Sequence, residues 1–363
     1  MSVRGKLSTS LRDIHESLGD AGTVELVREM IKDKKIRPED FSLQEIWHAF
    51  ERNKDNSVRS YSEAVSSDLF PIITCELISS KIIDAYTAVK TIGDTLTTTV
   101  PSKMDVETVA GFTASQGVDE VLEGSAYNDS MIGEKYVTIP HKKFGRIISI
   151  TEEMIFFDKT GQILARAAGI GQKAAYYREK LIVEGVQDVN SNVFRPSGVA
   201  TAFYRATASG VRKVNSRAAT PFGEDGLEQA MKLFHNMTDE EGDYIEPGLG
   251  QLYGLFPFDM WVRVNQMIQS TLVPEGVENA VNVWKGLFIP LTSPFITAQS
   301  TSTWYLGDFK NDFWWSEIYP LQTFSSKPGH EDEFNKDIKS KHKVRFYGQI
   351  GAITDKSCLK LTA

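Results

Sequence analysis

The stretch of residues 161–188 most limits how this chain can fold, because its pattern predicts one long helix. Asp158 or Thr160 can cap the start of this helix, which would span roughly 40 Å at 1.5 Å per residue. Apolar or small residues recur along one face at helical spacing, namely Leu164, Ala168, Gly171, Ala175, Ile182 and Val186. Small side chains let neighbouring backbone approach closely. We therefore predict that this helix is a spine on which other elements pack.

Residues 106–150, which precede the predicted spine, are prone to form β-strands. The pattern predicts two extended strands around a tip rich in glycine, serine, asparagine and aspartate. Residues 135–139 alternate polar and apolar side chains up to Pro140, which cannot donate to a strand ladder and indicates an edge or a bulge. A hairpin arm of this kind buries little surface by itself, so we expect it to lie on another surface.

The rest of the chain predicts an α+β fold. A polar, helix-rich lead-in covers residues 1–66. An amphipathic helix is predicted over residues 70–89, with a stripe of Ile73, Leu77, Ile78, Ile82, Ala85 and Val89. After the spine, predicted helices at 227–234 and 257–270 alternate with predicted strands at 252–256, 287–291, 304–306 and 318–321.

The composition is typical of a folded globular protein, with 363 residues of which 41% are apolar and 24% charged. Two cysteines, Cys75 and Cys358, are too few for a disulfide framework or a four-ligand zinc site. The most apolar stretch, residues 72–92, contains four charged residues, and the start of the chain has no signal-peptide pattern. We therefore expect no membrane segment.

The sequence predicts no catalytic, cofactor-binding or metal-binding residues. The six histidines are scattered singly, no GxSxG elbow is present, and neither cysteine has a histidine in a recognisable motif. Gly248, Gly250 and Gly254 have the spacing GxGxxxG, which does not match a dinucleotide-binding turn. Acids and bases that lie far apart in sequence would escape this search, so an unrelated α+β enzyme stays an alternative.

Charge is unevenly distributed along the chain, whose net charge is −8. That net charge argues against a protein whose main task is to neutralise nucleic-acid phosphates. Residues 118–134 contain no lysine or arginine but five acidic residues, Asp119, Glu120, Glu123, Asp129 and Glu134. Residues 334–363 contain seven lysines and arginines against two aspartates. The two blocks are either solvated surfaces or complementary contacts between subunits.

The basic block predicts a strand with one charged face. Alternation along a strand places Val344 and Phe346 on the side opposite to the basic residues Lys339, Lys341, Lys343 and Arg345. We interpret this face as a surface on which the acidic arm of a neighbouring subunit lies.

The order of these parts resembles the major capsid protein of tailed bacteriophages, with its Hong Kong ninety-seven type capsid fold. The passage GEKYVTIPHKKFGRIISITEEMIFFDKTGQIL, residues 133–164, looks like the connection from arm to spine helix. WYLGDF at residues 304–309 and FNKDIKSKHKVRFYGQIGAI at residues 334–353 look like the closing strands of that fold. The resemblance covers roughly residues 70–361 and depends on the order of the parts.

The resemblance implies a division of the chain into four parts. They are an N-terminal arm with lead-in helices at 1–105, an extended β-hairpin loop at 106–150, a peripheral domain at 151–212 and 323–363 with the spine helix 161–188, and an axial domain at 213–322. The tip of the loop, residues 118–134, contains no lysine, so we expect noncovalent overlap of subunits instead of lysine-to-asparagine cross-links.

The implied function is that of a structural major capsid protein, not an enzyme, which self-assembles through pentamers and hexamers into an icosahedral shell around double-stranded DNA. Implied partners are further copies of the chain, the packaged DNA on the inner face, portal and scaffolding proteins and a decoration protein, with no membrane and no cofactor. The implied location is the virion, after synthesis in the bacterial host cytoplasm. Alternatives are an encapsulin-type nanocompartment shell, an unrelated enzyme, and a tail or decoration protein.

Overall fold

The computed structural model describes a large part of the chain. The described residues are 25–26, 29–30, 69–112, 134–151, 153–154, 162–208, 214–239, 242–245, 250–274, 281–326 and 335–363. The predicted lead-in helices of residues 1–66, apart from four residues, and the tip of the hairpin therefore lie outside the described residues. Helices and sheets are mixed along the chain, which confirms the predicted α+β class.

The chain forms two compact units. The first unit contains Met1–Lys90, Lys143–Tyr177 and Tyr319–Tyr347, and the second contains Thr91–Lys142, Arg178–Ile318 and Gly348–Ala363. Helix α7 (Gln162–Val186) and strands β9 (Phe313–Ser325) and β10 (Ile338–Ala352) have residues in both units.

Helix α7 is the predicted spine, and its bounds lie within two residues of the prediction. Most of the predicted stripe is buried, and the stripe packs closely at its glycines. In the first unit, a Cβ added to Gly171 would overlap the carbonyl oxygen of Ile82, which belongs to helix α4 (Leu69–Ala88). In the second unit, a Cβ added to Gly185 would overlap the side chain of Ile350 on β10. Glycine at these two positions lets the neighbouring elements approach the helix axis.

Glu179, on the buried side of α7, holds the start of the short helix α5 (Gly93–Leu96) in the second unit. Its carboxylate accepts hydrogen bonds from the backbone N–H groups of Ile92, at 3.2 Å, and Gly93, at 2.8 Å. Burial raises the pKa of this carboxyl, although the two backbone hydrogen bonds act in the opposite direction. Beside it, Arg178 pairs with Asp94 at 2.9 Å. The carboxylate therefore satisfies two N–H groups that the helix start would otherwise leave without a partner.

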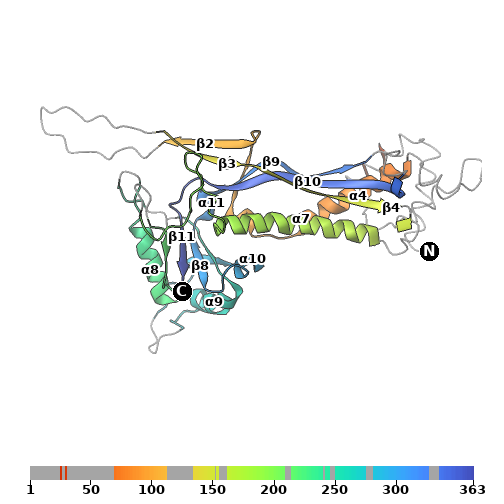
Figure 1. Cartoon of the computed structure of the whole chain (residues 1–363). Helices are drawn as coiled ribbons and strands as arrows, with labels where there is room; N and C mark the ends of the chain where they lie inside the picture. The colour runs from red at the N-terminus through yellow and green to blue at the C-terminus, as the bar shows by residue number, and fades with distance from the viewer. Residues whose placement is uncertain are drawn as a thin grey trace, which may run out of the picture. The chain divides into compact units, whose positions relative to one another are not determined.

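A four-stranded sheet has the order β1-β9-β10-β4, with β1 at Thr98–Pro101 and β4 at Lys142–Thr151. Figure 1 labels β4, β9 and β10 of this sheet. Strand β1 runs parallel to β9, and its register ends where Pro101 lies opposite Glu317. Pro320 of β9 lies beyond that register, so its lack of a backbone N–H removes no hydrogen bond to β1.

The hairpin consists of β2 (Val106–Phe112) and β3 (Glu134–Pro140), which pair in antiparallel register from Val106 opposite Pro140 to Phe112 opposite Glu134. Figure 1 shows these two strands side by side. The predicted second strand, which continued to residue 150, is wrong in this respect, because residues from Lys142 onward form β4 in the four-stranded sheet.

His141 separates the two strands and fixes the base of the hairpin. Its backbone N–H and its ring Nδ1 both donate to the carbonyl oxygen of Asp105, each over 3.0 Å. Its Nε2 lies 2.8 Å from the hydroxyl of Ser316 on β9. The ring thus connects the hairpin to the four-stranded sheet within the second unit.

The second unit contains a five-stranded sheet with the order β5-β11-β8-β6-β7. These strands are β5 (Ser216–Arg217), β11 (Cys358–Thr362), β8 (Thr303–Gly307), β6 (Leu252–Leu255) and β7 (Phe288–Leu291). Its helices are α8 (Glu224–His235), the 3-10 helix Phe258–Met260, α9 (Trp261–Gln269), α10 (Pro294–Thr297) and α11 (Phe309–Asp312). The predicted strands at 252–256, 287–291 and 304–306 and the predicted helix at 227–234 are confirmed within a few residues.

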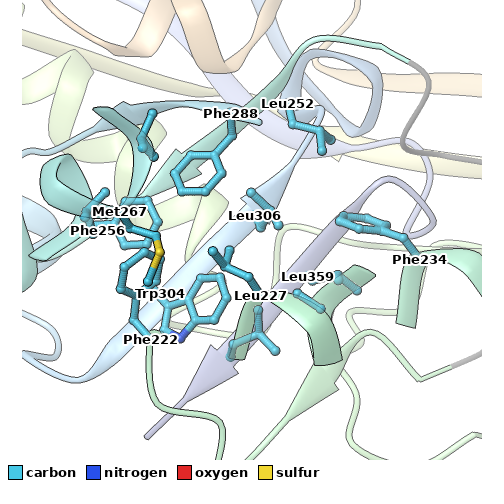
Figure 2. Packing of buried hydrophobic residues seen from close by; sticks show 14 of the residues in the cluster. Phe222, Leu227, Phe234, Leu252, Phe256, Met267, Phe288, Trp304, Leu306 and Leu359 are labelled. Atoms are coloured by element: carbon cyan, nitrogen blue, oxygen red, sulfur yellow. The ribbon is translucent and has the colours of Figure 1, made fainter. Parts of the chain in front are cut away.

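Aromatic side chains pack among aliphatic ones in the core of this sheet (Figure 2). Trp304 stacks on Phe256 with 5.8 Å between ring centroids and meets Phe222 edge-on at 5.4 Å. The indole N–H of Trp304 donates to the carbonyl oxygen of Thr220 over 3.0 Å. Burial of the large ring therefore leaves its one polar group satisfied.

Asp312 connects helix α11 to the turn between β10 and β11. Its carboxylate accepts hydrogen bonds from the hydroxyl of Thr354, at 2.5 Å, and the backbone N–H of Ser357, at 2.9 Å. The side chain is completely buried, and burial raises its pKa to about 7 even though these hydrogen bonds lower it. The folded state therefore holds a proton here that the unfolded chain releases at a lower pH.

This shift predicts a stability that falls as pH rises from about 4 to 7. In this range the unfolded Asp312 is ionised and the folded one is protonated, so the contribution of Asp312 to the free energy of unfolding decreases by about 1.4 kcal/mol per pH unit. Urea denaturation at a series of pH values measures the slope, and Asp312→Asn, which cannot ionise, should lack this contribution. Parallel curves for the wild type and the variant would show that Asp312 does not titrate as described.

Candidate functional site

Strand β10 has the two-sided pattern that the sequence predicts. Lys341 and Arg345 are half-buried and Lys343 is exposed, whereas the alternate residues His342, Val344 and Phe346 are buried. The side chain of Lys339, the fourth predicted basic residue, lies outside the described residues. The strand thus presents three of the predicted cations on one side.

Two aromatic residues of β9 hold the cations of this face in the first unit. The guanidinium of Arg345 lies 4.4 Å from the ring centroid of Phe324 and 4.9 Å from that of Tyr319. Its Nε and Nη2 both donate to Oε1 of Gln322, over 3.3 and 3.2 Å. The ammonium of Lys343 lies 5.2 Å from the Phe324 ring. Stacking and the forked hydrogen bond fix the plane of the guanidinium before any partner binds.

Strand β4, next to β10, extends the face. A Cβ added to Gly145 would lie 2.8 Å from the carbonyl oxygen of Val344 and 3.2 Å from Cβ of Arg345, so this side of β4 faces the same way as Arg345. Lys143, two residues earlier and exposed, lies on that side by strand alternation. We call Lys143, Lys341, Lys343 and Arg345 the basic face. Sequence reasoning missed Lys143, because only the pairing of β4 with β10 places it there.

The opposite side of the same two strands is apolar and packs on helix α7 in the first unit. The ring of Phe144 lies 5.2 Å from Phe346 and 5.4 Å from Tyr177 of the helix, measured between centroids. His342 is completely buried on this side, and burial lowers its pKa to about 4. Neither of its ring nitrogens has a hydrogen-bond partner in the part of the chain that the structure describes. The His342 ring is therefore neutral, and the charged side chains of this stretch of β10 lie on the basic side of the strand.

The acidic members of the predicted contact are mostly undescribed. Asp119, Glu120, Glu123 and Asp129 lie outside the described residues, and Glu134 is an exposed residue at the start of β3 in the second unit. The pairing of these residues with the basic face therefore stays a prediction.

The described residues offer no other site of obvious chemistry. Within them, no group of three or more histidine, cysteine, aspartate or glutamate side chains is placed to hold a metal ion. None of the helices in these ranges combines the length and the apolar character that crossing a membrane requires.

The described residues thus combine a long helix packed on long strands, a two-stranded hairpin and a five-stranded sheet with its own helices. The model of the family described as phage capsid protein matches residues 135–358, which is more than half of the chain. The chain belongs to this phage capsid protein family, and the predicted class, a structural capsid protein, is confirmed. The encapsulin-type and enzyme alternatives are not favoured.

Solved structures with a similar fold are capsid structures of low sequence identity. The capsid of the native GTA particle superposes with a TM-score of 0.52 and 13% identity, over 76% of this chain and 91% of that one. The capsid of the cyanophage P-SCSP1u superposes with a TM-score of 0.50 and 12% identity, over 76% of this chain and 88% of that one. No curated protein matches the chain. The likeness shows the Hong Kong ninety-seven type fold.

The stacked arginine predicts unequal effects of two substitutions on the basic face. Arg345→Ala removes both aromatic contacts and the forked hydrogen bond, and should lower the free energy of unfolding by about 1–2 kcal/mol. Lys343→Ala removes one more distant contact and should cost about 0.5 kcal/mol or less. Thermal unfolding of the unassembled chain compares the two. Equal effects would show that Arg345 is not fixed by its stack.

Proposed function

We propose that this chain is the major subunit of a phage head, and that it self-assembles through pentamers and hexamers into an icosahedral shell that encloses double-stranded DNA. The family match over residues 135–358 carries this proposal. The hairpin supports it, because β2 and β3 pair with each other in a sheet of only these two described strands. Val106 and Tyr136 of the hairpin remain 46% and 44% exposed, which favours a further surface that covers them.

The domain assignment belongs to the same proposal. Residues 1–105 would form the N-terminal arm, 106–150 the extended loop together with its return strand β4, 151–212 and 323–363 the peripheral domain, and 213–322 the axial domain. The axial domain would meet its copies around the five-fold and six-fold axes. Portal and scaffolding proteins, and a decoration protein on the outer surface, would be the protein partners, and the assembled subunit would reside in the virion after synthesis in the host cytoplasm.

The contact between subunits that we propose joins the acidic arm of one copy to the basic face of the next. A closed ring requires heterologous contacts, in which one patch meets a different patch on the neighbour. The arm carries Asp119, Glu120, Glu123, Asp129 and Glu134 without any lysine or arginine in residues 118–134, and the basic face carries four cations. Opposite charge on two different patches suits such a contact, since it sets register and suppresses wrong pairings.

Assembly of the purified chain tests the proposed function. Alone or with its scaffolding protein, it should form pentamers, hexamers or closed particles of uniform size, as seen by negative-stain microscopy and light scattering. Monomers and small oligomers under all assembly conditions would contradict the proposal, and so would particles that copurify with a cargo enzyme instead of DNA.

Charge reversal tests the arm contact separately from the shell. Replacing Asp119, Glu120 and Glu123 with lysine should reduce the yield and salt tolerance of particles while leaving the melting temperature of the free chain unchanged. The amide variants Asp119→Asn, Glu120→Gln and Glu123→Gln serve as the matched control and should give an intermediate loss. Adding Lys341→Glu and Lys343→Glu to the reversed arm should restore assembly. Normal particles from the reversed arm would exclude this contact, although the shell function would stand.

A further inference from the structure

Strand β2 has an edge that pairs with no strand in the part of the chain that the structure describes. At the base of the hairpin, His141 donates its backbone N–H to the carbonyl oxygen of Asp105, so the hydrogen-bonded pairs of β2 and β3 alternate from there. The backbone N–H and C=O groups of Val106, Thr108 and Ala110 therefore point away from β3, and these three residues are exposed. The edge of β2 thus offers three donors and three acceptors to another strand.

The outer edge of β3, by contrast, is covered within the subunit. The backbone N–H of Thr138 donates to the carbonyl oxygen of Arg195 over 3.2 Å. The backbone N–H of Ser197 donates to the carbonyl oxygen of Tyr136 over 2.9 Å. These two β3 residues lie opposite outward-pointing residues of β2, as the alternation of an antiparallel pair requires. The hairpin therefore has one closed edge and one open edge.

The edges of the two larger sheets indicate which strand of a second copy fits this open edge. The four-stranded sheet ends in β1 and β4, and the five-stranded sheet ends in β5 and β7. Strands β1 and β7 have four residues each and contain Pro101 and Pro290, and β5 has two residues. Strand β4 has ten residues and no proline. Among the edge strands that the structure describes, β4 is therefore the one long enough to pair with all seven residues of β2.

Charge favours the pairing of β2 with β4 over the pairing of either strand with its own copy. Strand β4 contains three exposed cations, Lys142, Lys143 and Arg146, and no acidic residue. Strand β2 contains one charged residue, Glu107, and begins directly after Asp105. Two copies of β4 side by side would place cations near cations, which destabilises a strand pair, whereas β2 beside β4 places an acidic strand next to a basic one. The cations of β4 thus disfavour self-association at an edge that a different strand can still use.

We propose that the open edge of β2 adds to the free edge of β4 in a neighbouring copy, so that the four-stranded sheet of one subunit continues into the hairpin of the next. This inference rests on the proposed function, because it needs copies that assemble. Strand β4 carries Lys143 of the basic face, so a hairpin beside β4 lies next to the surface that we propose as the partner of the acidic arm. Backbone hydrogen bonds would fix the register of the hairpin, and the charges would select its partner.

Removal of one outward N–H group tests the pairing. Thr108→Pro deletes a backbone donor that no residue of β3 uses, so the free chain should keep its melting temperature while the yield of particles falls several-fold. Thr108→Ala keeps the N–H group, serves as the matched control and should give the wild-type yield. Wild-type yield and salt tolerance of particles from Thr108→Pro would overturn the inference.

Cross-linking identifies the partner strand and needs no proline in the hairpin. Chains with Thr108→Cys are mixed with chains that carry one new cysteine within residues 145–149 of β4, and the mixture is assembled and oxidised. Disulfide-linked dimers should form with at least one position of this series, in particles and not in the unassembled mixture. The wild-type chain, with Cys75 and Cys358, measures the background.

The outcomes separate this inference from the proposed function. Particles without a cross-link at any position of the series would overturn the pairing with β4. Dimers from Thr108→Cys chains alone would also overturn it, since β2 would then meet its own copy. Wild-type chains that form no particles under any assembly condition would instead contradict the proposed function itself.

Discussion

The close approach of other elements to helix α7 is the constraint on which the rest of the structure depends. Gly171 and Gly185 have no room for a methyl group, because backbone or side-chain atoms of α4 and β10 occupy that space. Between these positions, Glu179 uses a buried carboxylate to hold the first N–H groups of α5. Close packing is sensitive to small changes in volume, so each of these contacts fixes a neighbour in one place along the helix.

A consequence of this packing is that each layer of the first unit has one apolar and one polar side. Phe144 and Phe346 are committed to the helix, and strand alternation then forces Arg345 and Lys343 to the other side. The aromatic residues of β9 offset part of the repulsion between the neighbouring cations, since Arg345 lies over two rings. Contacts within the subunit therefore fix the positions of Arg345 and Lys343 without any neighbouring subunit.

Much of this arrangement follows from local sequence pattern. The spine helix was predictable because its small and apolar residues repeat at helical spacing over seven turns. The two sides of β10 were predictable because basic and non-basic residues alternate from Lys339 to Arg345. The point at which the hairpin ends and β4 begins could not be predicted, because residues 135–150 are β-prone throughout. Only the tertiary contacts of His141 decide where the hairpin ends. The roles of Glu179 and Asp312 could not be predicted either, since their hydrogen-bond partners lie 86 and 45 residues away along the chain.

The strength expected of the arm contact fits a subunit that must assemble without error. Exposed ion pairs contribute about 0–1 kcal/mol each, so a few of them between an acidic arm and the basic face leave a single contact easily reversed. A wrongly placed subunit could therefore dissociate, whereas in the proposed shell every subunit would make the contact twice, once through its arm and once through its face. Under this proposal, weak pairing repeated around a closed surface would give both correction during growth and stability at completion, without a covalent bond between subunits.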